Sequence, residues 1–230
     1  MECRRSSLAR VTTKAPIQRG LTQVEVLVIV AVLAILVGLV VPWLANARSK
    51  TNRVTCNGHM KVVGLAFRIF ATDHAGRLPY ELNSEQGGTQ EISSDPSRIW
   101  QQFTILSNEI STPLILKCPS DGDRQRLNGF AGFTNNRYLS YFLRLGADTE
   151  DPRSILAGDR NLVLNGRSLS NEVLAVGTNA ILGFDRRIHN QEGNIGLADG
   201  SVQQVSSDRF PELFKDDRTK DARPFTLLVP

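Results

Sequence analysis

One stretch near the N-terminus is apolar almost without interruption. From Leu21 to Ala45 the only charged side chain is Glu25, and residues 26–41 are aliphatic residues, alanine or glycine throughout. An α-helix rises about 1.5 Å per residue, so this stretch is long enough to cross a hydrocarbon core about 30 Å thick. The pattern therefore predicts a membrane-spanning helix over residues 21–45.

Beyond Pro42 the apolar residues recur with the spacing of one helix face. They fall at alternating steps of four and three residues, at Cys56, Met60, Val63, Phe67 and Phe70. Such a stripe predicts an amphipathic continuation of the helix over residues 46–75, packed across a small sheet. Gly76 and Pro79 predict its end, since glycine tolerates a left-handed backbone and proline blocks further helix.

Residues 76–230 read as one globular α+β head with an antiparallel sheet, because short β-prone runs follow one another without long helices between them. A hairpin is predicted over residues 195–205, with Asp199-Gly200 in a type I′ turn. Short helices are expected at 97–110 and 210–215, and the apolar end (225–229) is expected to be an edge strand or disordered. Residues 112–117 are expected to form a strand or an extended entry into a turn, and the remaining strands are expected at 138–145, 154–159, 162–164 and 172–176.

The charge distribution argues against a nucleic-acid partner. The chain has 230 residues and a formal net charge of +4. Five of the 27 basic and one of the 23 acidic side chains lie in residues 1–20, which leaves 22 of each in residues 21–230. A protein that begins after residue 20 is therefore neutral and lacks the basic surface typical of nucleic-acid binders.

Three interpretations compete for the N-terminus. A secretory signal peptide explains the basic leader and the Ala45-Asn46-Ala47 that imitates a cleavage site, but its apolar region is usually only about 7–15 residues long. A signal anchor explains the length and the basic flank. Neither gives a role to Glu25, and a carboxylate within hydrocarbon is costly unless it lies near the interface or is paired, so Glu25 is a candidate functional residue.

The segment Arg19-Gly20-Leu21-Thr22-Gln23-Val24-Glu25, between a basic leader and an apolar helix, resembles the cleavage and methylation motif of type IV pilins and type II secretion pseudopilins. The resemblance implies that a prepilin peptidase cuts after Gly20 and methylates Leu21, which replaces the usual phenylalanine. It implies that Glu25 pairs with the amino terminus of an adjacent subunit during assembly. Pro42 matches the position of a helix-kinking proline in that family.

The resemblance implies a pilin-like fold and a structural, non-enzymatic role as a pseudopilin in a periplasmic filament of a type II secretion-like system. The domains would be the leader (1–20), the membrane and filament-core helix (21–45), its continuation (46–75) and the head (76–230). The protein would sit in the inner membrane as a single-pass precursor with its C-terminal domain in the periplasm. Its partners would be the prepilin peptidase, other pseudopilins, an inner-membrane platform protein and an assembly ATPase.

Two other functions remain open. The same processing signal serves type IV pilus and DNA-uptake pilins. From a different class, a membrane-anchored periplasmic enzyme or binding protein would need a polar pocket lined by His189, Asp159 and Asp199.

The C-terminal part carries a second motif. His189 precedes Asp199-Gly200 with nine residues between them, which resembles an element of a subgroup of pseudopilin-like proteins. Ser201 replaces a histidine common in that subgroup. His189, Asp199 and Ser201 could suggest a catalytic triad, but no nucleophile elbow surrounds Ser201 and the hairpin turn already accounts for Asp199.

No cofactor or metal site is expected, with one open point. Major pseudopilins hold a structural calcium ion, and acidic candidates here are Asp148, Glu150 and Asp151, or Asp121 and Asp123; neither group matches a calcium loop, which needs six to eight oxygens. In an oxidising compartment Cys56 and Cys118 could form a disulfide; the alternative is two buried free thiols. Cys3 lies in the leader.

Overall fold

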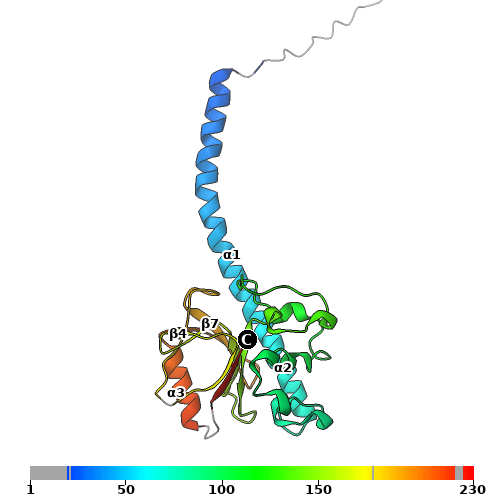
Figure 1. Cartoon of the computed structure of the whole chain (residues 1–230). Coiled ribbons are helices and arrows are strands. Elements are labelled where there is room, and N and C mark those ends of the chain that lie inside the picture. Colours follow the sequence, from blue (N-terminus) through cyan, green and yellow to red (C-terminus); the bar gives the residue numbers. More distant parts are fainter. Residues whose placement is uncertain (1–19, 21, 178, 221–224) are drawn as a thin grey trace, which may run out of the picture. The chain divides into compact units, whose positions relative to one another are not determined.

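The computed structural model describes residues 20, 22–177, 179–220 and 225–230 (Figure 1). The chain divides into two compact units, Met1–Asn46 and Ala47–Pro230. Helix α1 (Gln23–Asp73) begins in the first unit and ends in the second, and Pro42 lies within it. Residues 47–73 of α1 therefore belong to the same unit as the predicted head.

The apolar stripe of α1 is buried, as its spacing predicts. Cys56, Met60, Val63 and Phe67 are fully buried and Phe70 is 6% exposed. The helix ends at Asp73, and Gly76 follows in a left-handed conformation with φ of 81°. Its N–H donates to the carbonyl of Ala71 at 2.7 Å, which satisfies one of the carbonyls left free at the helix end.

The segment between α1 and the sheet is built from single 3₁₀ turns. The helix predicted over residues 97–110 is only one turn long, α2 (Gln101–Thr104). The strand predicted over residues 112–117 is wrong, because Pro113–Leu116 forms a 3₁₀ turn, η5. Pro113 has no N–H for a strand ladder and its fixed φ suits the first turn of a helix, and the Thr112 hydroxyl accepts the N–H of Leu114.

The head contains two antiparallel sheets. The larger has six strands in the order β5-β9-β1-β2-β7-β8, and the smaller has three in the order β4-β3-β6. The strands of the larger sheet are β1 (Tyr141–Leu145), β2 (Ile155–Asp159), β5 (Glu172–Ala175), β7 (Glu192–Leu197), β8 (Val202–Ser206) and β9 (Thr226–Val229). Those of the smaller are β3 (Leu162–Leu164), β4 (Arg167–Ser168) and β6 (Leu182–Phe184).

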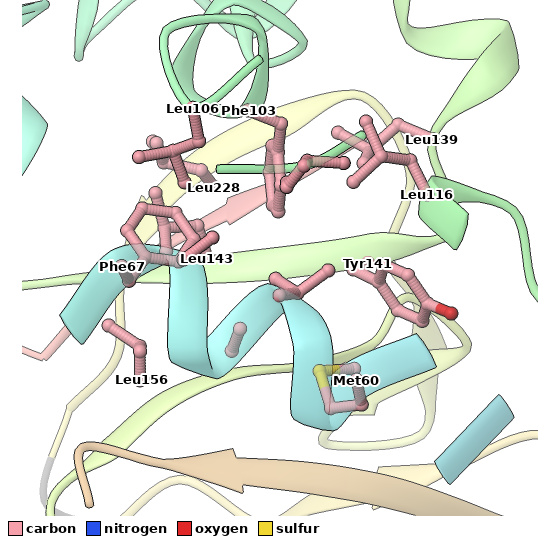
Figure 2. Packing of buried hydrophobic residues seen from close by; sticks show 14 of the residues in the cluster. Met60, Phe67, Phe103, Leu106, Leu116, Leu139, Tyr141, Leu143, Leu156 and Leu228 are labelled. Carbon is pink, nitrogen blue, oxygen red and sulfur yellow. The ribbon is translucent and has the colours of Figure 1, made fainter. Parts of the chain in front are cut away.

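The six-stranded sheet separates two hydrophobic cores. On one face Met60 and Phe67 of α1 pack among strand residues such as Tyr141 and Leu143, together with Phe103 (Figure 2). The other face packs against the smaller sheet and α3 (Phe210–Lys220), with side chains that include Phe142, Phe184, Phe214 and Leu227. Tyr141, Phe142 and Leu143 alternate between the two cores, as the two-residue repeat of a strand requires. The predicted α+β class with an antiparallel sheet is confirmed.

The predicted hairpin is present, but its turn is not type I′. Strands β7 and β8 pair from Glu192–Ser206 to Gly196–Val202. Gly200 has a φ of 83°, whereas Asp199 is not among the described residues with positive φ. The N–H of Gly200 donates to the carbonyl of Leu197 at 2.9 Å, and the N–H of Leu197 donates to the carbonyl of Ser201 at 2.9 Å. This is a type I turn followed by a glycine bulge, which fits a three-residue connection.

The C-terminal end is an interior strand. The apolar residues of β9 pair with β1 on one side and β5 on the other, so the predicted edge position or disorder is wrong. Leu227, Leu228 and Val229 are buried because both faces of the sheet are covered. Helix α3, predicted over residues 210–215, extends to Lys220.

Replacing Gly200 by alanine tests the hairpin turn. The left-handed backbone at this position costs an alanine about 1–2 kcal/mol, and the new methyl group would meet Arg68 Cδ at an ordinary 3.4 Å. We therefore expect the free energy of unfolding, measured in urea by near-UV circular dichroism, to fall by about 1 kcal/mol. Gly58→Ala on α1, where a methyl group has open space, should change stability in the opposite direction by about 0.5–1 kcal/mol. Equal stability of Gly200→Ala and the wild type would contradict the turn assignment.

Candidate functional site

The N-terminal part of α1 is an apolar helix that the described residues leave uncovered. Residues 23–41 have a mean hydropathy of 3.2, and none of them is buried. Their large side chains are solvent-exposed, Val24 by 70% and Leu39 by 68%. The helix is long and apolar enough to cross a membrane, and a signal sequence near the N-terminus would share these properties.

Glu25 takes part in a capping box at the start of this helix. Its Oε2 accepts the backbone N–H of Thr22 at 2.7 Å and the Thr22 hydroxyl at 2.8 Å, and its own N–H donates to that hydroxyl at 3.3 Å. These bonds satisfy backbone donors that a helix start leaves without partners. Gly20 precedes the helix and is exposed, while Leu21 lies outside the described residues. The sequence reading of Glu25 missed this local role, although the Thr22-x-x-Glu25 spacing signals it.

A buried polar cluster lies in the head domain and consists of Cys56, Cys118, Asp159 and His189. Each residue offers one ligand atom, and these four atoms all lie within 4.8 Å of one another. Cys56 belongs to α1, Cys118 follows η5, Asp159 ends β2, and His189 lies between β6 and β7. The first three are fully buried and His189 is 5% exposed. Four distant chain segments thus bring their polar side chains to one point inside the protein.

The contacts within the buried polar cluster run in a chain. The Cys56 thiol lies 3.3 Å from Asp159 Oδ1, and Asp159 Oδ2 lies 3.4 Å from His189 Nε2. His189 Nε2 in turn lies 3.4 Å from the Cys118 thiol. The hydroxyl of Tyr141 forms one wall, 3.8 Å from the Cys56 sulfur.

Burial sets the protonation states of the cluster. It raises the pKa of Asp159 to about 6, against the opposing hydrogen bonds from Asn194 and Cys56. Burial, followed by the charge of Arg53, lowers the pKa of His189 to about 4. Burial also raises the pKa of the Cys56 thiol well above its usual value. Near pH 7 the cluster therefore holds a neutral imidazole, a carboxylate that is mostly ionised, and a protonated Cys56.

Neighbouring residues fix the orientation of the cluster. Asn194 donates both its backbone N–H and its side-chain amide to Asp159 Oδ2, at 2.7 and 2.9 Å. The backbone carbonyl of His189 accepts a hydrogen bond from Arg53 at 3.1 Å, and Arg53 also forms an ion pair with Glu192. Asp159 Oδ1 is left directed toward Cys56.

The hairpin motif does not form one site. His189 faces Asp159 and Cys118, whereas Asp199 is exposed in the hairpin turn, where Oδ1 accepts the N–H of Ser201 at 2.7 Å. The Asp199 carbonyl accepts a hydrogen bond from Arg68. The arrangement therefore separates Asp199 and Ser201 from His189, and of the three residues expected to line an enzyme pocket only Asp159 and His189 come together.

Four of the five acidic residues considered for calcium make other contacts. Asp121 receives two hydrogen bonds of 2.7 Å from buried Arg160, which also reaches Asp123 at 3.0 Å. Burial alone would raise the pKa of Asp121, but the Arg160 guanidinium outweighs it and the pKa is lowered. Asp148 and Asp151 each accept a backbone N–H two residues ahead, from Glu150 and Arg153. These contacts are those of an ion pair and of loop turns.

Sequence reasoning paired Cys56 with Cys118 as a possible disulfide and placed His189 and Asp159 in one possible enzyme pocket, but it did not bring the two pairs together. Both cysteines are free thiols in the structure. No two of the four residues are closer than 30 positions in the chain, so no short metal-binding spacing connects them. The available signal was weak: a cysteine on the buried stripe of a helix, and an aspartate at the end of an otherwise apolar strand.

The chain was also compared with known proteins. No protein-family model matches it, and neither the curated proteins nor the solved structures yielded a match.

Proposed function

We propose that the protein is a pilin-like structural subunit, a pseudopilin of a type II secretion-like periplasmic filament. A prepilin peptidase removes the leader after Gly20. Before assembly, the subunit is anchored in the inner membrane by its apolar helix, with its head in the periplasm. A platform protein and an assembly ATPase move it into a filament through residues 21–45. The role is mechanical and involves no catalysis.

The observation that carries this proposal is the apolar start of α1. None of residues 23–41 is buried within the chain, and their mean hydropathy is 3.2. Exposed apolar surface of this extent needs lipid or a partner to cover it. A filament core of parallel copies of the same helix supplies the same apolar surroundings as lipid. The same helix is then covered first by lipid and, after assembly, by the helices of neighbouring subunits.

Glu25 supports the same proposal. Its carboxylate sits in the first turn of α1, where the helix dipole favours a negative charge. Thr22 provides hydrogen bonds that make the carboxylate tolerable at the edge of a membrane. Cleavage after Gly20 places a new amino group four residues before Glu25. The amino group of a neighbouring subunit then offers the charge partner that the apolar filament core lacks.

The mature N-terminus tests the proposal. We expect mass spectrometry of the chain, produced in a bacterial host that carries a prepilin peptidase, to show a protein that begins at an N-methylated Leu21. Gly20→Val should block processing. Gly38→Val changes a glycine with open space in the middle of the same helix and should leave processing unchanged. A start at Arg48, after Ala47, would indicate a signal peptide, and an intact Met1 would indicate a plain anchor; either result refutes the proposal.

A further inference from the structure

We propose that the buried polar cluster is a structural zinc site in which Cys56, Cys118, Asp159 and His189 bind one Zn²⁺ ion. Nothing in the filament role requires this site, so the two proposals stand or fall separately. The inference rests on the identity of the donors, their mutual distances, their burial and the residues that orient them.

The donor set matches zinc. Zn²⁺ binds cysteine sulfur, histidine nitrogen and aspartate oxygen, nearly always with four ligands in structural sites. Calcium and magnesium require several oxygen ligands, and the cluster offers one carboxylate. All four donors come from the protein and all four residues are buried, which is typical of a closed structural site and leaves no position for substrate.

The distances match a tetrahedron around such an ion. With ordinary Zn–S, Zn–N and Zn–O bond lengths, the ligand atoms at the corners of a regular tetrahedron lie about 3.3–3.8 Å apart. The Cys56 sulfur lies 3.3 Å from Asp159 Oδ1, and the Cys118 sulfur lies 3.4 Å from His189 Nε2. The other oxygen of the Asp159 carboxylate, Oδ2, lies 3.4 Å from His189 Nε2, which is long for a hydrogen bond between nitrogen and oxygen. The largest separation in the group, within 4.8 Å, needs only side-chain adjustment.

The second layer of contacts is that of a metal site. Asn194 holds Asp159 Oδ2 with two hydrogen bonds and so leaves Oδ1 for the metal. Contacts of this kind orient the ligands and tune affinity in known metal sites. Binding replaces the two thiol protons, which leave to solvent, and the ion places a positive charge beside the buried carboxylate.

The position of the site gives it a structural effect. It would join α1 to the segment after η5, to the end of β2 and to the connection between β6 and β7. The bound ion would thus fasten the helix that enters the proposed filament to the sheet of the head. A force that pulls α1 away from the head would then have to break metal–ligand bonds as well as the apolar contacts between α1 and the sheet.

Metal analysis of the full-length protein in detergent micelles tests the inference. The protein is reduced, incubated with zinc chloride, desalted and measured by inductively coupled plasma mass spectrometry. We expect one zinc ion per chain. Cobalt(II) in place of zinc should give the absorption of a tetrahedral site and a thiolate-to-cobalt charge-transfer band. Removal of zinc by a chelator should lower the melting temperature by about 5 °C or more.

Matched variants locate the ion. Cys118→Ser and Asp159→Asn should remove stoichiometric zinc, and Asn194→Ala should weaken binding by about 10–100-fold through the lost orientation of Asp159. His74→Gln changes a histidine directly after the end of α1, where it hydrogen-bonds the Phe70 carbonyl, and it should keep the full zinc content. The cobalt spectrum of the wild type needs no variant and so remains informative if a ligand variant misfolds.

Three results would overturn the inference. The first is a reduced, folded protein that binds no zinc or cobalt. The second is zinc that remains in a folded Cys118→Ser variant at the wild-type stoichiometry. The third is a Cys56–Cys118 disulfide in protein isolated without reductant, detected by mass spectrometry of peptides, because a bridged pair has no thiolates to offer.

Discussion

Replacing Glu25 by alanine is expected to abolish filament assembly while cleavage after Gly20 continues. Removing one partner of a buried charge pair typically costs about 2–5 kcal/mol. That corresponds to about a 30-fold or greater loss in each subunit contact, since about 1.4 kcal/mol is a factor of ten. A filament repeats this contact at every subunit, so the loss accumulates. Sedimentation of sheared filaments and electron microscopy measure assembly, and mass spectrometry of the N-terminus measures cleavage.

The capping box found at the start of α1 makes two further variants decisive. Glu25→Gln keeps a hydrogen-bond acceptor for Thr22 but removes the charge, so it should fail to assemble as Glu25→Ala does. Thr22→Ala removes the cap and keeps the charge. It should weaken the helix start by about 1 kcal/mol and still assemble. Normal filaments from Glu25→Gln, with poor filaments from Thr22→Ala, would show that Glu25 serves the helix start alone.

Replacing Asp217 by alanine is expected to destabilise the head domain by about 3–5 kcal/mol. Asp217 Oδ2 lies 2.7 Å from Arg144 Nη1, and the side chains are 1% and 0% exposed. Arg144 also donates to the Ser154 hydroxyl at 2.8 Å and lies over the Phe225 ring at 4.6 Å. The variant removes a carboxylate that pairs with this fully buried guanidinium, and a buried charge is costly when its ion pair is broken. Urea unfolding followed by near-UV circular dichroism measures the change.

Two controls separate this buried pair from the general loss of a carboxylate on α3. Asp216 is the next residue toward the N-terminus, 52% exposed and 4.0 Å from Arg153, and its replacement by alanine should cost less than about 1 kcal/mol. Arg144→Met added to Asp217→Ala also removes the buried guanidinium and should recover part of the loss. Full recovery is not expected, because Asp217 Oδ1 also accepts the N–H of Ile155 at 3.0 Å. Equal effects of Asp216→Ala and Asp217→Ala would contradict the proposed energetic importance of the pair.

The sequence by itself determined the elements whose signal is local. The length of the apolar run predicted a helix, which the structure shows from Gln23 onward, and the periodic stripe from Cys56 to Phe70 predicted the face that is buried. Asp199-Gly200 located the hairpin, because glycine adopts the required positive φ at little cost. The strand predicted after Thr112 was wrong. The apolar run Pro113–Leu116 is typical of a strand, but the proline favours the first turn of a helix and the run forms a 3₁₀ turn.

Only the tertiary structure decided which distant residues meet. Arg144 lies inside a β-prone run, and its partner Asp217 stands 73 positions later on α3, a separation at which no local pattern specifies pairing. The apolar end forms the interior strand β9 because its backbone pairs with β1 on one side and β5 on the other, and neither pairing is visible in the local sequence. In the same way Cys56, Cys118, Asp159 and His189 acquire a common chemistry only when α1 is laid across the sheet. Periodicity reports which face of an element is buried, whereas contacts between elements depend on how the faces are packed together.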